Sequence, residues 1–433
     1  MQCKRVVVSL TLSSLLAISA MRMPFAGAQE TPPTGKKGSE KKADSSAKNG
    51  DKGSPKESSR QWAELVARRE KLMKSLDNLR ERSEAADFEG KLKIQEEFEK
   101  LQTEFLREIL PGMAKLAPAV LEKDPTDAVA AQFVIGKAID SQKYASAVAT
   151  LNRLIKSGTA KPNLVEQVVG MLFQENRYAD VMAIADPLVD AREVNPRLLV
   201  IDSMAHFNSN DFARAKELTL RAAKADAGTA AGSEDFSSRC DEEAELWKKE
   251  LEIRAKEAKA DDLPRVLLKT NKGDIVLELF ENEAPNTVAN FISLVEARKY
   301  DGTEFHRVLP NFMAQGGDDG QGGPGYTIAC ECYGEKARRH FQGSLSMAHS
   351  GRDTGGSQFF LTCAPQPHLD WAPGKVKDNH TVFGRIIEGL DVALALRQAD
   401  SELERPADAI IAARVIRKRD HDYKPVKSGR GKK

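Results

Sequence analysis

The chain has 433 residues, of which 30% are charged and 41% hydrophobic, so it is long enough for two or three domains and is not wholly disordered. Its 65 basic and 64 acidic residues nearly cancel, which excludes an overall charge that would favour nucleic acid or an acidic surface as the main partner. Any binding must therefore come from local sites.

Residues 1–28 have the pattern of a secretory signal peptide. A basic start at Lys4 and Arg5 precedes an apolar run from Val6 to about Ala20, and the small residues AGA end at Ala28. A membrane anchor is the alternative, but the run is shorter than the ~20 residues of a bilayer span. We predict cleavage after Ala28, export to the periplasm or out of the cell, and no membrane span in the mature chain.

Residues 29–58 contain almost no apolar side chains and many Lys, Ser, Gly, Glu and Pro residues. Such a segment cannot bury enough surface to offset its chain entropy, so it is predicted to be a disordered linker. Residues 421–433 end in the similar sequence "KPVKSGRGKK" and are predicted to form a basic, solvated tail.

Residues 59–225 are predicted to be helical. Between Gln61 and Asp124 apolar residues recur every three or four positions between charges, which indicates an amphipathic helical hairpin. They are Trp62, Leu65, Val66, Leu72, Leu76 and Leu79.

The following stretch repeats itself. The segments "QKYASAVA", "NRYADVMA" and "NDFARAKE" carry evenly spaced aromatic residues at Tyr144, Tyr178 and Phe212. The close-packing positions three residues later are Ala147, Val181 and Ala215. The spacing and the turn pattern resemble tetratricopeptide repeats, whose period is about 34 residues and whose stacked helix pairs form a solenoid. Such a region is either a protein-interaction surface or a helical spacer.

A change of composition at "ADAGTAAGSEDFSS" marks a boundary, so residues 226–262 are predicted to be a linker and a charged helix from about Asp241 to Ala260. Residues 263–420 are predicted to form the last domain. It opens with a β-hairpin, "RVLLKT" and "IVLELF" joined by "NKGD". A helix follows in "APNTVANFISLVEARKY", with an apolar stripe at Val288, Phe291, Ile292 and Val295.

Four cysteines remain after signal cleavage, at Cys240, Cys330, Cys332 and Cys363. The sequence "CEC" is too sparse for a zinc site, because no second Cys or His pair stands at ligand spacing. Export would permit a disulfide that involves Cys330 or Cys332. Buried free thiols are the alternative, and the sequence does not choose between them.

Several catalytic templates fail on this domain. "GQGGPG" fits G-x-G-x-x-G, but Pro324 and a strand-like segment follow where a phosphate-binding helix should begin. Ser357 lacks the G-x-S-x-G frame of a nucleophile turn. The histidines of the domain do not fall at metal-ligand spacing, so no metal and no cofactor are predicted.

What remains is "FHRVLPNFMAQGGDDG", in which Arg307 stands among apolar residues. A fixed guanidinium beside an apolar pocket suits rotation about the peptide bond before proline, whose barrier is about 18–20 kcal/mol. As the amide twists, the proline nitrogen gains a lone pair, and a donor to that nitrogen stabilises the twisted state more than the planar one.

Four ordered segments, "FHRVLPNFMAQGGD", "GSLSMAH", "GGSQFFLT" and "HTVFGRIIEGLDV", resemble the cyclophilin family of peptidyl-prolyl cis-trans isomerases, from about Arg265 to Arg417. The resemblance implies a multidomain chain with the helical repeat region followed by a closed eight-stranded antiparallel β-barrel capped by two helices. It implies binding of proline-containing peptides, and no nucleic acid.

Carried over motif by motif, the resemblance makes Arg307 the catalytic guanidinium, with Gln315 to orient it and the substrate carbonyl. The implied substrate-binding residues are Phe312, Met313, Ala348, His349, Phe360, His368, Leu369 and His380. Phe305 and Phe359 are interpreted as core residues.

Two departures from the family pattern stand out. His368 occupies the position where many eukaryotic members carry a Trp that contacts cyclosporin, so weak drug binding with intact catalysis is expected. "LDWAPGKVKDNH" also lengthens a turn that is usually very short. The chain is thus predicted to be an exported isomerase that assists folding, the alternative being a proline-binding scaffold or holdase chaperone with incidental isomerase activity.

Overall fold

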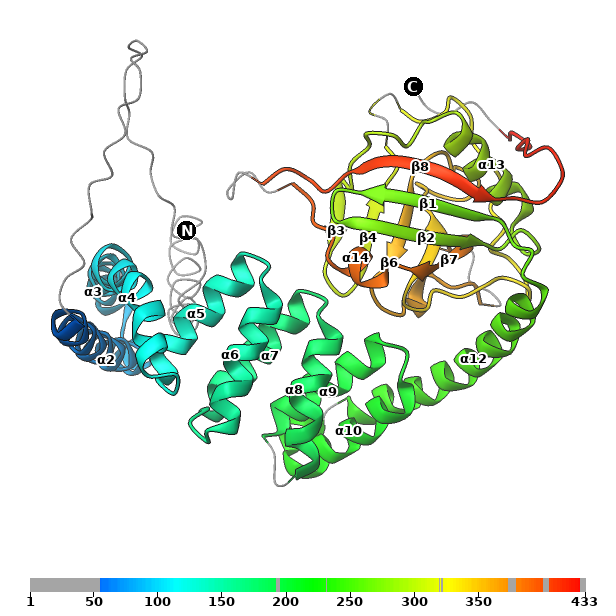
Figure 1. The fold of residues 1–433 in the computed structure, drawn as a ribbon. Helices are drawn as coiled ribbons and strands as arrows, with labels where there is room; N and C mark the ends of the chain where they lie inside the picture. The colour runs from blue at the N-terminus through cyan, green and yellow to red at the C-terminus, as the bar shows by residue number, and fades with distance from the viewer. Residues whose placement is uncertain are drawn as a thin grey trace, which may run out of the picture. The chain divides into compact units, whose positions relative to one another are not determined.

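The computed structural model describes residues 55–191, 195–230, 232–318, 320, 322–372, 379–399 and 405–428. The chain divides into two compact units, Met1–Val168 and Val169–Lys433. Figure 1 labels helices and strands of both units. The predicted signal peptide lies outside the described residues. None of the helices in the described ranges is both long and apolar enough to cross a membrane.

The described part of the first unit is helical. Its elements are α2 (Pro55–Ala85), α3 (Phe88–Glu104), the π-helical turn η1 (Phe105–Ile109), α4 (Leu110–Lys123), α5 (Ala128–Asp140) and α6 (Tyr144–Lys156), while α7 (Pro162–Gln174) crosses into the second unit. Helix α2 begins earlier than the predicted end of the linker, so residues 55–58 are helical. Pro55 at the helix start and Glu57 in the first turn both favour a helix N-terminus.

The predicted amphipathic pattern corresponds to the core of this unit. Trp62, Leu72, Leu76 and Leu79 are buried, and α2 packs against both α3 and α4. The indole nitrogen of Trp62 also donates a 3.0 Å hydrogen bond to Asp127, which caps α5. The first helix of the hairpin is therefore hydrogen-bonded to the start of α5, the helix before the first repeated segment.

The period of the repeated segments reappears in the backbone. Gln142, Asn176 and Asn210 all have a left-handed conformation, with φ of 56°, 56° and 65°. In each case the next helix starts two residues later, at a buried aromatic side chain. A left-handed residue is a common way to end a helix, and Asn adopts it more readily than most residues.

The second unit continues with α8 (Tyr178–Ala191), α9 (Pro196–Asn208), α10 (Phe212–Ala225), the short α11 (Ala227–Ala230) and α12 (Ser233–Ala260). The charged helix predicted from about Asp241 to Ala260 is present, and it is longer than predicted because it takes in part of the predicted linker. Helix α12 is 28 residues long and starts before Asp241. Its buried Cys240 and half-buried Trp247 pack in one apolar cluster with Phe212 of α10 and with Phe341 of the following domain, so this helix is fixed by packing.

The last domain contains one eight-stranded antiparallel sheet in the order β3-β4-β6-β5-β7-β2-β1-β8. Its strands are β1 (Arg265–Thr270), β2 (Gly273–Leu279), β3 (Arg307–Leu309), β4 (Met313–Gly316), β5 (Ser344–Met347), β6 (Phe359–Thr362), β7 (Val382–Glu388) and β8 (Ile410–Arg417). The predicted opening hairpin is confirmed as β1 and β2, with Lys269 opposite Asp274.

The sheet is curled, but the predicted closed barrel is not confirmed. Strands β3 and β8 are the ends of the strand order, and among the described residues no strand ladder joins them. Instead, the segment before β3 bonds to the segment that leads into β8: Phe305 N donates to Asp408 O at 2.8 Å, and Ile410 N donates to Thr303 O at 2.8 Å.

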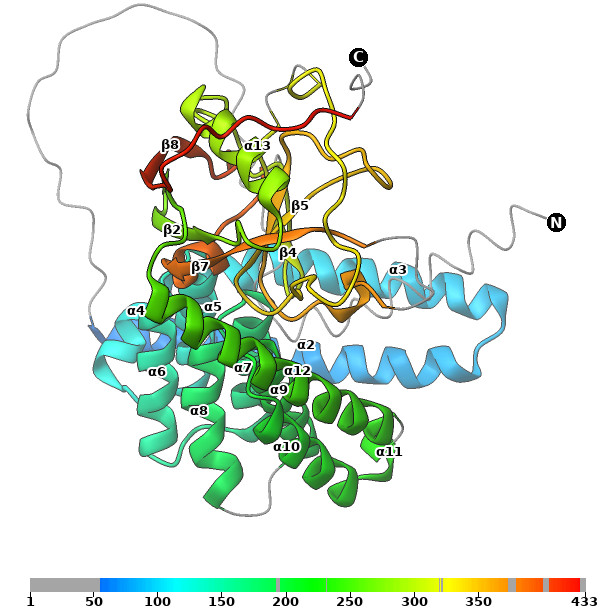
Figure 2. The ribbon, with the colours of Figure 1, turned by 90° about the vertical axis from the view of Figure 1, so that its right-hand side faces the viewer.

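Two helices accompany the sheet. Helix α13 (Pro285–Glu296) packs against β8 (Figure 2), and its predicted apolar stripe is buried. Helix α14 (Leu390–Leu394) has only five residues and lies against β2. The predicted two-helix cap is therefore not confirmed.

The described part of the predicted tail packs on this domain. Tyr423 is buried, Val426 N donates a 2.7 Å hydrogen bond to Asn286, and Ser428 N donates a 2.9 Å bond to Thr327 O. Residues 421–428 are therefore anchored to the domain by the Tyr423 ring and two hydrogen bonds from backbone N–H groups, while most of their side chains are exposed, as predicted for a solvated tail.

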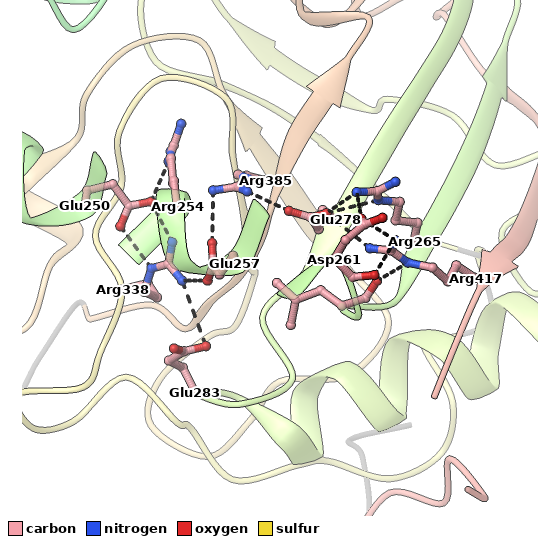
Figure 3. A network of polar contacts seen from close by, with 11 residues as sticks. Glu250, Arg254, Glu257, Asp261, Arg265, Glu278, Glu283, Arg338, Arg385 and Arg417 are labelled. Atoms are coloured by element: carbon pink, nitrogen blue, oxygen red, sulfur yellow. Dashed lines mark hydrogen bonds and ion pairs between the residues drawn. The ribbon is translucent and has the colours of Figure 1, made fainter. Parts of the chain in front are cut away.

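A network of buried charges joins α12 to the sheet domain (Figure 3). Arg338 donates two hydrogen bonds to Glu250, at 2.9 and 2.7 Å, and one to Glu257 at 2.5 Å. Its guanidinium also lies over the ring of Phe280, 3.6 Å from the ring centroid. Arg385 extends the network by pairing with Glu257 at 3.0 Å and with Glu278 at 2.6 Å. We call these residues the α12 junction.

Candidate active site

The candidate site is built on one row of residues across β3, β4 and β6. Arg307 of β3 lies opposite Gln315 of β4, and Gln315 lies opposite Phe360 of β6. Directly opposed residues of antiparallel strands point to the same face of a sheet. The predicted guanidinium, amide and aromatic side chain therefore share one face because of the strand register.

The alternate residues of the same strands point to the other face. Ala314, Phe359 and Leu361 belong to the main core of the domain, together with Phe305. The interpretation of Phe305 and Phe359 as core residues is confirmed, because both are fully buried. One face of this part of the sheet thus builds the core, and the other face is left for a ligand.

An apolar floor covers the site face. Met313, Ala348, Phe360 and Leu369 form a separate buried cluster, against which Phe312 packs. They line a cavity of about 800 Å³. The cavity is lined by nine of the ten predicted site residues: Arg307, Phe312, Met313, Gln315, Ala348, His349, Phe360, Leu369 and His380.

His368 is the predicted residue that the structure does not place in the cavity lining. It is exposed, in the short 3₁₀ turn Pro367–Leu369, and its ring lies 5.7 Å from the ring of Phe312. It therefore stands beside the cavity and not inside it. The middle of the predicted long loop after Leu369, residues 373–378, lies outside the described residues.

Arg307 is exposed at the cavity wall. The described residues offer its guanidinium no hydrogen-bond partner, and the ring centroid of Phe312 lies 6.0 Å from it. The turn between them contains Asn311, which has a left-handed φ of 59°. This turn bends the chain back, so that Arg307 and Phe312 face the same cavity.

Gln315 has a different partner from the one predicted. Its Nε2 donates a 2.8 Å hydrogen bond to Gln358, and Gln358 Nε2 donates a 3.0 Å bond to Asp318. No hydrogen bond joins Gln315 to Arg307 in the described structure. The amide chain instead fixes the Gln315 side chain at the cavity wall, where its position is set independently of the guanidinium.

Gln358 and Asp318 are cavity residues that the sequence reasoning missed. Gln358 stands in the quoted segment "GGSQFF", directly before the buried Phe359 and Phe360. Strand alternation places Gln358 on the same face as Phe360, so the sequence did carry a signal for it. Asp318 follows the end of β4 in a glycine-rich turn, where no such alternation applies, and its role is visible only from its contact with Gln358.

Two stacked histidines form another part of the wall. The rings of His349 and His380 lie 4.0 Å apart with an interplanar angle of 16°. His380 Nδ1 is 2.9 Å from Met347 O, and His349 Nε2 is 2.7 Å from Asn379 O. Each ring is thus held by a backbone carbonyl group, and His380 also meets Phe360 edge to face.

The sequence "CEC" lies behind His349. A hydrogen bond from Cys332 and a second from His349 lower the pKa of the Cys330 thiol below its usual value, while the shared bond and burial raise the pKa of Cys332. Burial is the largest influence on His349 and would lower its pKa, but the hydrogen bond to Cys330, the charge of that thiol and the hydrogen bond to Asn379 O together raise it. All four cysteines of the described chain are free thiols; Cys240, Cys332 and Cys363 are buried, as in the buried-thiol alternative, whereas Cys330 is half-buried.

The sequence of this domain matches a known family. Residues 265–415 match the model of the family "Cyclophilin type peptidyl-prolyl cis-trans isomerase/CLD". A peptidyl-prolyl cis-trans isomerase of Synechococcus elongatus is 50% identical over 143 residues, which are 32% of this chain and 92% of the relative. The chain belongs to the cyclophilin-type peptidyl-prolyl cis-trans isomerase family. An isomerase of Helicobacter pylori is 47% identical over 34% of this chain and 91% of its own length.

A solved cyclophilin-type isomerase of Cryptosporidium parvum is similar to 35% of this chain and 97% of its own, with 30% sequence identity and a TM-score of 0.31. The isomerase match covers only the last domain, residues 265–415. The protein is therefore a peptidyl-prolyl cis-trans isomerase with a helical region before the catalytic domain.

Proposed function

We propose that this isomerase is exported and assists the folding of exported proteins, and that its helical region holds client or partner proteins close to the catalytic domain. The signal-peptide pattern of residues 1–28 supports export. The repeated helix pairs support the second part, because tetratricopeptide-like pairs usually present a concave surface to other proteins.

Arg307 is the proposed catalytic residue. Its guanidinium donates a hydrogen bond to the proline nitrogen of the substrate when the peptide bond is twisted, and so lowers the barrier to rotation. A rate increase of about 10⁵-fold corresponds to ~7 kcal/mol of such differential stabilisation. The observation that supports this role best is that the guanidinium faces the cavity and has, among the described residues, no hydrogen-bond partner to give up.

The apolar floor is the proposed proline pocket. Met313, Phe360 and Leu369 are buried and close-packed, so a proline ring can be held there without the loss of any polar contact. Gln315, held by Gln358, is placed to bind the substrate carbonyl. The backbone near Ala348 and His349 is the proposed binding surface for the extended substrate peptide.

The helical part of the second unit touches the turn that carries Phe312. Asn311 N donates a 2.7 Å hydrogen bond to Asn176, and the Asn311 side chain accepts bonds from Tyr178 at 2.9 Å and from Asn208 at 3.1 Å. The left-handed residue of a repeat thus contacts the left-handed residue beside the pocket. This contact supports a joint function of the repeats and the pocket.

The test is exchange NMR on a proline-containing peptide with the full chain, in wild-type form and as Arg307→Ala. The removal of a donor that acts only in the transition state should lower the exchange rate about 10²–10³-fold. Arg352→Ala is the matched control, since Arg352 is an exposed arginine of the same domain that does not line the cavity. Equal rates for wild type and Arg307→Ala would contradict the assigned role.

The cellular role needs a separate experiment. Fractionation of the native cells should place the chain, with the segment up to Ala28 removed, outside the cytoplasm. If Arg307→Ala cells fold exported proteins as well as wild-type cells do, the alternative of a proline-binding scaffold or holdase is favoured instead.

A further inference from the structure

A buried carboxylate in the second unit lacks the partners that buried charges normally have. Asp202 of α9 has an exposed fraction of 0%, and neither of its side-chain oxygens accepts a hydrogen bond from the described residues. Buried carboxylates are expensive unless they are paired, and most buried polar atoms are hydrogen-bonded.

The groups around Asp202 are those of a metal site. Asp186 comes from α8, and Asp202 and His206 stand one turn apart on the same face of α9. His206 Nε2 lies 3.2 Å from Asp186 Oδ1 and 3.9 Å from Asp202 Oδ1. One ligand atom from each residue lies within 4.8 Å of the other two.

His206 is oriented for this use by its second nitrogen. His206 Nδ1 is 2.9 Å from Asp211 Oδ2, so a proton on Nδ1 directs the Nε2 lone pair toward the two carboxylates. Either a proton or a metal ion must therefore lie between Nε2 and these carboxylate oxygens. A carboxylate on the far nitrogen is also the usual support of a metal-binding histidine.

We propose that Asp186, Asp202 and His206 bind one divalent transition-metal ion, with Zn²⁺ as the best-fitting class. At metal–ligand distances of ~2.0–2.2 Å, tetrahedral ligands lie roughly 3.3–3.6 Å apart, so a small inward movement closes the site. Two carboxylates and one imidazole suit zinc better than calcium, which takes more oxygen ligands.

One neighbouring charge opposes the metal. Arg214 Nη2 donates to Asp186 Oδ1 at 3.2 Å and to Asp190 Oδ1 at 2.7 Å, so it neutralises part of the Asp186 charge. Arg214 does not donate to Asp202, whose oxygens stay without hydrogen bonds in the described structure. The metal supplies the compensation that Asp202 lacks, and it links the second helix of one repeat pair, α8, to the first helix of the next, α9.

The test uses the full chain, stripped with a chelator and titrated with Zn²⁺ in a calorimeter. Asp202→Asn and His206→Gln should each remove one equivalent of bound zinc, or weaken it at least tenfold. Asp186→Asn, at a half-exposed position, gives the same test with little risk to folding. Asp190→Asn is the matched control, because Asp190 is exposed on the same helix, contacts the same Arg214, and should leave binding unchanged.

Co²⁺ distinguishes this site from the thiols of "CEC". Binding to carboxylate and imidazole ligands should give ligand-field bands without thiolate-to-metal charge-transfer bands, and these bands should disappear in His206→Gln. Equal zinc stoichiometry and affinity in the wild type and in all three ligand variants would overturn the proposal. An absence of zinc binding to the wild type would overturn it as well.

Discussion

The second unit uses arginine in two opposite ways. At the pocket, Arg307 is exposed and faces a cavity. At the α12 junction, only 2% of the Arg338 side chain is exposed, and its guanidinium forms ion pairs with Glu250 and Glu257. A guanidinium that must act on a substrate is thus left open to it, whereas one that joins two elements is fully enclosed.

This difference predicts where substitutions should act. Loss of the Arg307 side chain leaves nothing buried without a partner, so it should change activity and not stability. Loss of the Arg338 side chain takes one cationic partner from each of two buried carboxylates, Glu250 and Glu257, so it should change stability and not the chemistry of the pocket. The comparison can therefore be tested from both sides.

Arg338→Ala should have the largest effect on stability. Breaking a buried ion pair from one side costs about 3–5 kcal/mol, because it leaves uncompensated buried charge. The free energy of unfolding in urea can be followed by the fluorescence of Trp247, which lies on α12 against Phe341. Arg352→Ala is the control with an expected change within about 0.5 kcal/mol. A loss of less than about 1 kcal/mol in Arg338→Ala would contradict the importance of the junction.

A second prediction concerns pH at the same helix. Glu243 of α12 is buried, and its burial, with Asp370 nearby, raises its pKa to about 7. In the unfolded chain the pKa is about 4.3, so the folded state binds this proton more tightly. The stability that the protonated group contributes is present at low pH and is lost as the pH rises from about 4.3 through 7.

Glu243→Gln removes this ionisation. Its stability relative to wild type should therefore increase by roughly 2–3 kcal/mol between pH 5 and pH 8. Urea unfolding of both proteins at the two pH values measures this change. The exposed neighbour Glu242→Gln should give no such gain. A relative stability of Glu243→Gln that is independent of pH would show that Glu243 ionises as in the unfolded chain.

A smaller effect on stability is expected where the helical repeats contact the turn 309–313, which carries Phe312 of the pocket. Asn176→Gly keeps the left-handed backbone but removes the acceptor of the Asn311 amide. An unsatisfied donor costs about 1–3 kcal/mol when it is buried, so hydrogen exchange of the turn 309–313 should become faster. Gln142→Gly changes the equivalent position of the preceding repeat, in the first unit, and should leave this turn unchanged. Identical exchange in the two variants would mean that the repeats do not hold the turn.

The sequence predicted the pocket better than the junction, for a physical reason. Arg307, Gln315 and Phe360 are placed by strand register, which follows from local alternation once the motif order is known. The partners of Arg338 stand 88 and 81 residues away on a helix that was predicted to be partly linker. The charge pattern of that helix did not indicate which glutamates would be buried.

The proposed metal ligands were missed for a related reason. Asp202 and His206 stand at positions i and i+4, which is ligand spacing on a helix, but many exposed Asp and His residues share that spacing. The informative fact is that Asp202 is fully buried without a hydrogen bond from the described residues, and burial depends on the packing of α9 between its neighbours. Sequence periodicity predicted the helix pairs, but not which polar side chains they would enclose.

The smallest predicted effect concerns the rim of the pocket. His368 lies beside Phe312 but outside the cavity lining, where a Trp would add a larger apolar surface. We expect wild type to bind cyclosporin more weakly than nanomolar, and His368→Trp to bind it roughly tenfold more tightly, or about 1.4 kcal/mol. Fluorescence or calorimetric titration measures the affinity, with His421→Trp, an exposed histidine away from the cavity lining, as the control.

Exchange rates on a proline peptide should be equal in all three proteins, because Arg307 and the apolar floor are unchanged. A nanomolar affinity of the wild type would mean that the Trp position does not decide drug binding, and that the floor formed by Met313, Phe360 and Leu369 carries it alone.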